Sequence, residues 1–340
     1  MAATALIDSN IPDLKLLSKG KVRDIYATSS PDYLLFVASD RISAYDVILK
    51  NVNHYLHSLP YTFIGIHSRI HLLLLDDNNC PHRRKGIPDK GRVLTELSLF
   101  WFDKLRSIIP NHVVTSRIEE MPEELHKYRE ELEGRSILVK KAKVIPLEAI
   151  VRGYITGSAW AEYKKSGTAH GISLPEGLQE SQKLPTPLFT PSTKAEQGAH
   201  DENISPEQAA ALIGPELYDR VSHIALKLYI AAAEHAATRG LIIADTKFEF
   251  GLVGDDNELI LIDEALTPDS SRYWPQEGYA PGHGQPSFDK QYLRDWLTSQ
   301  GFRKGLEDGP DGQGWTMSEE VVQGTRERYL NARDTLLKSD

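Results

Sequence analysis

Cysteine is almost absent from this sequence, because Cys80 is the only one among 340 residues. A single thiol cannot form a disulfide within the chain, so the disulfide framework typical of small secreted proteins is lacking. The first ten residues have no basic flank before an apolar stretch and predict no signal peptide, so we expect a cytoplasmic protein. The 12 histidines show no close metal-ligand spacing with Cys80, which argues against a zinc site.

Long hydrophobic runs and an excess of positive charge are also lacking. The four leucines at residues 72–75 are followed at once by Asp76 and Asp77, whereas a membrane helix needs about 20 mostly apolar residues. The formal net charge of -9 argues against a nucleic-acid or anionic membrane surface, because such partners require an extended basic field. A small anionic ligand can still bind at a local basic pocket.

The composition that remains is that of an ordinary globular protein, with 40% hydrophobic and 26% charged residues. A chain of 340 residues lies between one large domain and two modest ones, so we expect two lobes, residues 1–140 and 141–340. We see no repeat of fixed period. We expect a monomer or a small homo-oligomer that has neither a nucleic-acid nor a membrane partner.

The first lobe is predicted to be an antiparallel sheet packed against a helix. Short strand patterns at residues 20–26 and 33–38 are separated by the turn residues SSPD. Apolar residues then recur at helical spacing over residues 95–107 behind Thr95, the expected N-cap. The acidic and basic stretch at residues 119–134, which ends in glycine, predicts an exposed helix.

The second lobe is predicted to mix strands and helices. Residues 136–139 form a buried-strand pattern, and Pro146 predicts extended chain rather than helix beyond it. Residues 175–215 are rich in Pro, Ser, Thr and Gly, which predicts a long functional or mobile loop. The rest predicts a helix stopped by Gly240, a hairpin that turns at residues 254–257, and two C-terminal helices. These segments are residues 222–239, 241–253 with 258–266, 289–300 and 318–337.

Three charged residues alternate along the first strand of the hairpin. Asp245, Lys247 and Glu249 project from one face of an otherwise apolar strand, because strand side chains alternate between faces. If Glu249 pairs across the turn with Asp263, the two carboxylates stand roughly 5 Å apart, which favours a shared Mg²⁺ completed by phosphate oxygens. The alternative is a solvated face that Lys247 neutralises. A register shift of one residue would place the two carboxylates on opposite faces.

A glycine turn flanked by basic residues precedes the first complete strand, in the sequence SKGKVRD at residues 18–24. Gly20 allows backbone amides to approach phosphate oxygens, and Lys19, Lys21 or Arg23 can neutralise them. The pattern matches neither the P-loop nor the dinucleotide fingerprint, so an ordinary basic turn is the alternative.

Glu148 and Arg152 lie four residues apart in the sequence VIPLEAIVRGYITGS, residues 144–158. The two side chains share a face in either a helix or a strand, so both conformations direct them towards one ligand. An ion pair between them is the alternative.

Two further segments cluster charged and hydroxyl side chains at strand ends. Residues 39–46 follow a buried strand, where a binding loop and a capped helix start are equally compatible with the spacing. Residues 267–274 place hydroxyls beside Arg272, whose guanidinium suits a phosphate or a carboxylate. A plain turn with an exposed arginine is the alternative there.

Taken together, these segments resemble the SAICAR synthetase family. The resemblance runs in family order from Leu16 to Trp296 and implies an α+β, two-lobed ATP-binding fold related to the protein kinases. An N-terminal antiparallel sheet would cover ATP, and the larger α+β lobe would hold the substrate and metal sites. The segments that carry the resemblance are residues 20–26, 39–46, 144–158, 189–196, 200–203, 243–251 and 263–274.

The resemblance also implies an ATP-dependent ligase of purine biosynthesis. L-Aspartate would be joined to carboxyaminoimidazole ribotide (CAIR) to give SAICAR, ADP and phosphate, through an acyl phosphate. Positioning and charge neutralisation must provide most of the catalysis in such a transfer. A small-molecule kinase on the same scaffold is the alternative, and a nucleotide sensor without turnover would have little use for several metal-binding carboxylates.

The resemblance assigns roles to individual residues. Glu249 and Asp263 match ligands of the nucleotide-bound Mg²⁺, and Glu148 matches a carboxylate near that metal; Lys21, Glu148 and Lys247 are the expected catalytic residues. The residues expected to contact ATP, in the glycine turn and in the adenine-binding hinge at residues 140–146, are Lys19, Gly20, Lys21, Arg23 and Lys140. Those expected to bind the ribotide phosphate are Arg152, Ser158 and Arg272. The remaining residues expected to contact substrate are Asp40, Arg41, Ser43, Asp46, Lys194, His200, Asp201 and Ser270.

Overall fold

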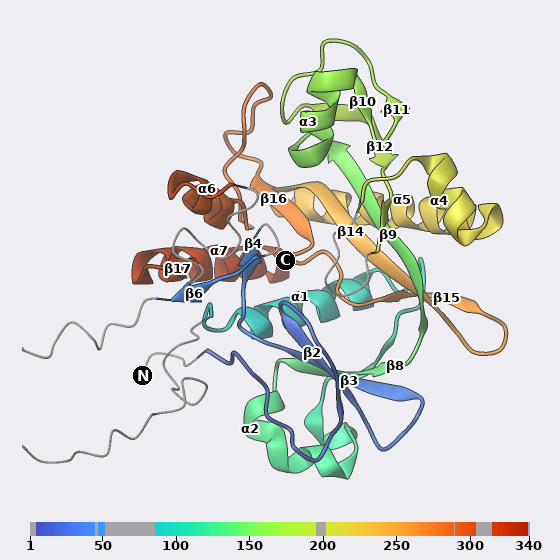
Figure 1. Ribbon diagram of the computed structural model, residues 1–340, viewed down its shortest axis with the longest axis vertical. Helices are drawn as coiled ribbons and strands as arrows, with labels where there is room; N and C mark the ends of the chain where they lie inside the picture. The colour runs from blue at the N-terminus through green and yellow to red at the C-terminus, as the bar shows by residue number, and fades with distance from the viewer. Residues whose placement is uncertain are drawn as a thin grey trace, which may run out of the picture.

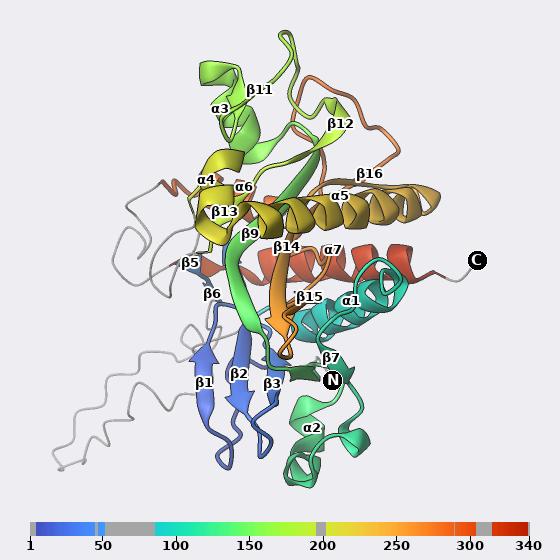
Figure 2. The same ribbon diagram turned by 90° about the vertical axis from the view of Figure 1, so that its right-hand side faces the viewer.

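The computed structural model describes residues 5–44, 47–51, 86–194, 202–288, 290–303 and 315–338. Two antiparallel sheets dominate the part of the chain that is described, which confirms an α+β fold. The smaller sheet lies at one end of the molecule, and the larger one runs through its centre (Figures 1 and 2). Cys80, Asp46, His200 and Asp201 fall outside the described residues.

The smaller sheet has the strand order β1-β2-β3-β8-β7, with every neighbouring pair antiparallel. This confirms the predicted antiparallel sheet near the N-terminus. Its strands are β1 Leu16–Lys19, β2 Arg23–Ala27, β3 Tyr33–Ala38, β7 Val113–Thr115 and β8 Ser136–Lys140.

The predicted helix over residues 119–134 is wrong. The chain instead forms the 3-10 helices η2 Ile118–Glu120 and η3 Glu123–Tyr128 and the single turn α2 Arg129–Leu132. Pro122 separates η2 from η3, because its backbone is extended and has no N–H with which to continue a helix. The segment also covers the small sheet, since Leu125 is fully buried in the core of that sheet.

The larger sheet has the order β12-β9-β14-β15, with β13 added on β9 and β16 on β14. Its two central strands are long and antiparallel, and the predicted hairpin and its turn are confirmed. The helix α5 Pro215–Thr238, which ends before Gly240 as predicted, packs on this sheet (Figure 2). The strands are β9 Lys143–Tyr154, β12 Lys183–Phe189, β13 Ser192–Thr193, β14 Leu241–Val253, β15 Glu258–Ile262 and β16 Ser271–Pro275.

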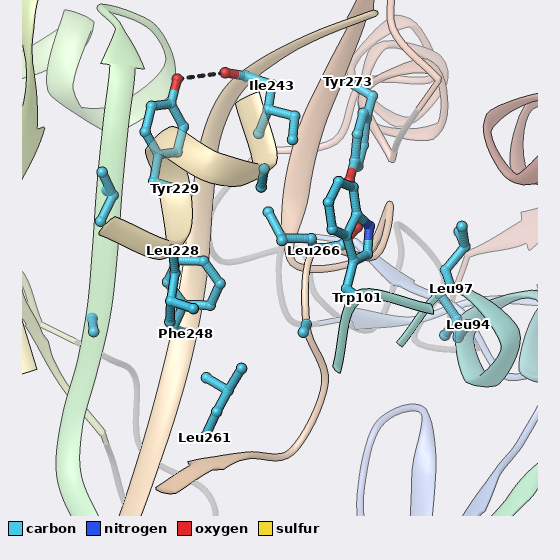
Figure 3. Packing of buried hydrophobic residues seen from close by; sticks show 14 of the residues in the cluster. Leu94, Leu97, Trp101, Leu228, Tyr229, Ile243, Phe248, Leu261, Leu266 and Tyr273 are labelled. Carbon is cyan, nitrogen blue, oxygen red and sulfur yellow. Dashed lines mark hydrogen bonds between the residues drawn. The ribbon is translucent and has the colours of Figure 1, made fainter. Parts of the chain in front are cut away.

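The main core lies between this sheet and the helices α5, α1 Lys90–Lys104 and α7 Glu319–Leu337. Figure 3 shows Leu228 of α5 beside Phe248 of β14, Tyr229 of α5 hydrogen-bonded to the Ile243 carbonyl, and Trp101 of α1 beside Tyr273. The expected lobe boundary at residue 140 falls between β8 and β9, although α1, from the first 140 residues, packs in this larger core.

The N-cap prediction for α1 is wrong, because the helix begins five residues before Thr95, at Lys90. The Thr95 hydroxyl donates to the Gly91 carbonyl inside the helix, at 2.9 Å. Gly91 is required by close packing, since a Cβ there would lie 2.4 Å from the Ala38 carbonyl oxygen. A glycine that normally weakens a helix thus marks a backbone contact in the first turn.

The predicted long loop over residues 175–215 contains β12, β13 and the helix α4 Pro206–Ile213. Its many prolines are accommodated because β12 leaves its register with β9 between Lys183 and Leu188. Both predicted C-terminal helices are confirmed. Among the described residues, no helix is long and apolar enough to cross a membrane. The remaining elements are β4 Ser43–Ala44, β5 Val47–Ile48, β6 Lys50–Asn51, α3 Gly157–Ser166, β10 Thr168–Ala169, β11 Ile172–Ser173, α6 Gln291–Ser299 and β17 Thr316–Met317.

Candidate functional site

One face of β9 and β14 carries a row of charged side chains. Across the two strands, Glu249 lies opposite Glu148 and Asp245 lies opposite Arg152, with Lys247 midway between them. Alternate residues share a face, so all five project to the same side. The residues between them, such as Phe248, are buried in the main core that includes α5. The alternation predicted from the sequence for Asp245, Lys247 and Glu249 is therefore confirmed.

The first group on this face is the carboxylate end, which we define as Glu148, Glu249 and Asp263 with their cations. Lys247 forms an ion pair with Glu148 and lies 3.9 Å from Glu249, and Lys194 forms an ion pair with Glu249. Burial opposes the charge of Lys247, but Glu148 and Glu249 raise its pKa above the ordinary value. Burial raises the pKa of Glu249, and the neighbouring charge of Asp263 raises it further.

The predicted pairing of Glu249 with Asp263 is wrong by one residue, because Ile262 lies opposite Glu249. Asp263 follows the last residue of β15 and has a left-handed backbone, with φ of 66°. The alternation of faces does not apply beyond the strand. Asp263 therefore remains close enough to Glu249 to raise its pKa, despite the shift in register.

Arg23 on β2 of the smaller sheet forms an ion pair with Asp263 and lies 3.8 Å from Glu264. Burial raises the pKa of Asp263, but the charge of Arg23 outweighs it and holds that pKa below the ordinary value. The glycine turn that precedes Arg23 is thereby linked to the carboxylate end.

The resemblance implies that Glu249 and Asp263 bind a nucleotide-bound Mg²⁺ with Glu148 close by. Within the residues that the structure describes, no three His, Cys, Asp or Glu side chains converge in a way that could hold a metal. The three carboxylates are instead paired with Lys247, Lys194 and Arg23. Their chemistry still fits Mg²⁺, which prefers oxygen donors and usually takes one or two carboxylates together with substrate phosphates.

The second group is the arginine end, which we define as Arg152, Arg272, Ser158 and Asp245. Arg152 donates to Asp245 at 2.9 Å and to the Ser158 hydroxyl at 3.2 Å. Arg272 on β16 forms an ion pair with the same Asp245 oxygen. The structure thus brings together the three residues predicted to bind the ribotide phosphate. Asp245 was recognised in the sequence only as part of the charged face, and its pairing across β9 and β16 is not visible there.

His170 and Thr190 complete the surroundings of Arg152, although no pattern in the sequence indicates either residue as part of the site. The Arg152 Nε atom donates to the Thr190 hydroxyl at 3.0 Å, and one terminal nitrogen lies 3.5 Å from Nε2 of His170. Nδ1 of His170 is 2.8 Å from the Pro191 carbonyl, to which it donates. Burial and the charge of Arg152 lower the pKa of His170, which favours the neutral ring with Nε2 as acceptor. His170 lies in the turn of the short hairpin formed by β10 and β11, and only the fold brings this hairpin to Arg152.

The glycine turn is closed by a hydrogen bond of 2.8 Å from the Gly20 amide to the Arg23 carbonyl. Lys19 pairs with Asp8 at 2.8 Å, and Lys21 is exposed in the turn. Gly20 is favoured here because a Cβ would lie 2.8 Å from the Arg23 carbonyl oxygen.

Asp40 and Arg41 are buried beneath the turn rather than placed in the charged row. Asp40 accepts from the Gly91 amide at 2.8 Å and from Arg135 at 3.1 Å. Arg41 pairs with Asp24 at 2.6 Å and donates to the Gly20 carbonyl at 2.9 Å. Arg41 thereby supports the glycine turn, and Asp40 links the start of α1 to Arg135 just before β8.

The other expected contacts are dispersed. Ser43 is buried in β4, and Lys140 is exposed at the end of β8, shortly before β9 begins. The Ser270 hydroxyl accepts from the Thr267 amide at 3.1 Å inside a turn. The structure therefore gathers Lys194 into the carboxylate end and places Ser270 beside the row, where its carbonyl accepts from the Lys247 amide at 3.0 Å, but leaves Ser43 and Lys140 outside the row.

Comparison with known proteins gives a consistent result. The sequence model of SAICAR synthetase matches residues 16–55 and 81–308. The chain is 50% identical, over 98% of both chains, to the phosphoribosylaminoimidazole-succinocarboxamide synthase of Maridesulfovibrio salexigens. It is 51% identical, over 95% of this chain and 94% of its relative, to the enzyme of that name from Pichia angusta. The solved structure of SAICAR synthase from Saccharomyces cerevisiae complexed with SAICAR is similar, with a TM-score of 0.79, 45% identity, and coverage of 98% of this chain and 99% of that one.

Proposed function

The chain belongs to the SAICAR synthetase family, and we propose that it joins L-aspartate to CAIR at the expense of ATP, giving SAICAR, ADP and phosphate. The observation that carries this proposal is the row of charges on β9 and β14, which ends in carboxylates on one side and arginines on the other. Glu148 and Arg152 are four residues apart on one strand, roughly 13 Å. An extended ligand can span the row if one anionic group binds Arg152 and a second is neutralised beside Glu148 by Lys247 or a metal ion.

The reaction must first activate a carboxylate, because the free group would have to expel oxide to form an amide. Transfer of the terminal phosphoryl group of ATP to the CAIR carboxylate forms an acyl phosphate and releases ADP. The aspartate amine then attacks the acyl carbon, the C–O bond to phosphate breaks with its electron pair, and the nitrogen loses a proton. Such a sequence depends chiefly on alignment of the reactants and on neutralisation of charge.

The carboxylate end is proposed to bind the nucleotide and the reacting carboxylate. Glu249 and Asp263, with Glu148 nearby, would hold Mg²⁺, which supplies positive charge that stabilises phosphate oxygens. Lys247 and Lys194 lie against these carboxylates and can neutralise the reacting groups. Arg23, which now pairs with Asp263, and Lys21 in the turn above would contact phosphates of ATP. Lys19 and Lys140 remain the further candidates for contact with the nucleotide.

The arginine end is proposed to bind the phosphate of the ribotide. Arg152 and Arg272 converge on one oxygen of Asp245, so the group presents two guanidiniums that can bind an anion. Arginine suits this task because its planar fork gives paired, charge-assisted hydrogen bonds. Asp245, Thr190 and His170 fix the direction of the Arg152 fork.

Small-molecule substrates are therefore expected on this face, and we propose a cytoplasmic monomer or small homo-oligomer. Arg41 is proposed to act by supporting the glycine turn, and Asp40 by holding the start of α1, since their polar atoms contact the protein itself.

A product assay tests the proposed function. Purified protein is incubated with ATP, Mg²⁺, CAIR and aspartate, and each component is omitted in turn; SAICAR should form only in the complete mixture. Hydroxylamine in place of aspartate should trap the acyl phosphate as a hydroxamate. Release of a stable phosphate ester without aspartate would overturn the ligase assignment in favour of a kinase.

A further inference from the structure

A second cluster of charges is buried behind the site, centred on Asp269. The Asp269 carboxylate is 2.8 Å from Nζ of Lys90 on α1 and 3.0 Å from Nζ of Lys290, just before α6. Its other oxygen accepts a hydrogen bond from the Tyr329 hydroxyl on α7. The Lys90 side chain is 0% exposed and that of Asp269 is 2% exposed. Three separate parts of the chain therefore converge on one carboxylate.

This arrangement is difficult to explain by stability alone. Burying two ammonium groups and a carboxylate carries a large desolvation penalty, and such clusters can often be replaced by apolar residues without loss of stability. Burial raises the pKa of Asp269, but Lys290 and Lys90 outweigh that effect and keep the carboxyl ionised. The cluster is thus a fixed charged anchor.

The anchored segment is the β15–β16 connection, which we define as residues 263–270. Asp263 begins this connection, and Arg272 follows it in β16, so it joins the carboxylate end to the arginine end. Its second half is a tight turn, because the Ser270 and Ser271 amides donate to the Thr267 carbonyl at 3.1 and 2.9 Å. The Ser270 carbonyl in turn accepts from the Lys247 amide at 3.0 Å.

We propose that Asp269 is a positioning residue: α1 and α7 hold it, and it fixes the β15–β16 connection so that Arg272 meets the ribotide phosphate. The inference rests on the proposed function of the arginine end. It gives the C-terminal helix a role in substrate binding although α7 contributes no residue to the charged row. Asp269 lies three residues before Arg272 and six after Asp263, so ribotide binding should depend on it more than ATP binding does.

The test compares Asp269→Asn and Tyr329→Phe with a control variant, Arg326→Gln. Arg326 also lies on α7 and pairs with Asp89 at the start of α1, so its loss breaks a contact between the same helices without touching the connection. We expect the KM for CAIR to rise about tenfold in Asp269→Asn and about threefold in Tyr329→Phe. The KM for ATP should change less than twofold, and Arg326→Gln should leave both KM values unchanged.

Two further measurements separate this inference from the proposed function. Hydrogen–deuterium exchange should be faster at Ser270 and Ser271 in Tyr329→Phe and unchanged in Arg326→Gln. The affinity of each variant for ribose 5-phosphate is measured by titration. It should be lowest in the variant whose KM for CAIR is highest, and unchanged in Arg326→Gln. If the unmodified protein makes no SAICAR, the proposed function is wrong. These two measurements still test whether Asp269 fixes the β15–β16 connection.

A lowered melting temperature with unchanged exchange at Ser270 and Ser271 would overturn the positioning role. Equal changes in Tyr329→Phe and Arg326→Gln would overturn it as well. Should Asp269→Asn fail to fold, Tyr329→Phe decides the question, because it removes one hydroxyl and keeps the ring that packs beside Lys90.

Discussion

The two ends of the charged row differ in their balance of charge. At the carboxylate end Glu148, Glu249 and Asp263 face three cations, whereas at the arginine end two guanidiniums converge on one oxygen of Asp245. An anion can bind at the arginine end through these two guanidiniums. A metal-bound nucleotide at the carboxylate end must exchange partners with Lys194 or Arg23. The comparison predicts metal-dependent effects at one end and simple losses of affinity at the other.

The largest effect is expected from Glu249→Gln and Asp263→Asn. Each change removes a charged oxygen donor, so kcat/KM for ATP at limiting Mg²⁺ should fall on the order of 100-fold, as for groups that stabilise transferring phosphoryl oxygens. Added Mg²⁺ should restore part of the activity. The measurement is a Mg²⁺ titration of the rate, with circular dichroism as the control for folding. Unchanged activity of both variants at limiting Mg²⁺ would show that Glu249 and Asp263 do not bind the metal.

Arg152→Lys and Arg272→Lys are expected to cause a smaller loss, which affects the affinity for CAIR and not that for ATP. A lysine cannot reproduce the paired hydrogen bonds of the guanidinium, so affinity for CAIR should weaken about 10- to 100-fold. ATP affinity should stay nearly constant, which separate titrations of the two ligands will show. Arg152→Lys should also be less stable than Arg272→Lys, because the side chains are 4% and 22% exposed. A loss of affinity for ATP alone would show that Arg152 and Arg272 bind a phosphate of ATP and not that of the ribotide.

Lys21→Ala should lower kcat about tenfold, equivalent to roughly 1.4 kcal/mol of transition-state stabilisation. Its ammonium is expected to neutralise phosphate charge during transfer. Lys19→Ala is the comparison from the same turn, because Lys19 is the next candidate for contact with the nucleotide and its exposed ion pair with Asp8 should itself contribute little. The rate at saturating substrates distinguishes the two. A normal rate in Lys21→Ala would transfer the phosphate role to Lys19 if Lys19→Ala is slow, and to Arg23 if Lys19→Ala is also normal.

Ser158→Ala should have the smallest effect. The hydroxyl interacts with Arg152 at 3.2 Å and is expected to donate one further hydrogen bond to the ribotide phosphate. Loss of one such bond should weaken CAIR binding about two- to tenfold. If Ser158→Ala weakens CAIR binding more than Arg272→Lys does in the same titration, phosphate recognition depends on the start of α3 rather than on the arginine pair.

Local patterns were sufficient to predict the elements that build the site. Strand alternation placed Asp245, Lys247 and Glu249 on one face, and the hairpin turn was found from its glycine and acidic residues. The register was missed because Asp263 lies beyond the end of β15, where a left-handed residue redirects the chain. No pattern of alternation predicts the direction of a side chain after a strand has ended.

Contacts between distant segments were not predictable from the sequence. Asp245 and His170 reach Arg152 only through pairing of strands and packing of a short hairpin. Asp40 follows a buried strand and resembles a binding residue in sequence, yet its carboxylate accepts from Gly91 at the start of α1 and from Arg135. A loop carboxylate that binds a ligand and one that binds backbone amides look alike until the fold is known.

The strict alternation of the charged row also limits how this gene can change in length. One residue inserted between Asp245 and Glu249 would turn one end of the row towards α5, placing charged side chains in an apolar core and apolar ones towards the substrates. The turn at residues 254–257 is exposed and lies beyond the carboxylate end, so added residues there leave the row intact. Along this hairpin, insertions and deletions should therefore accumulate at the turn and be absent from the stretch between Asp245 and Glu249.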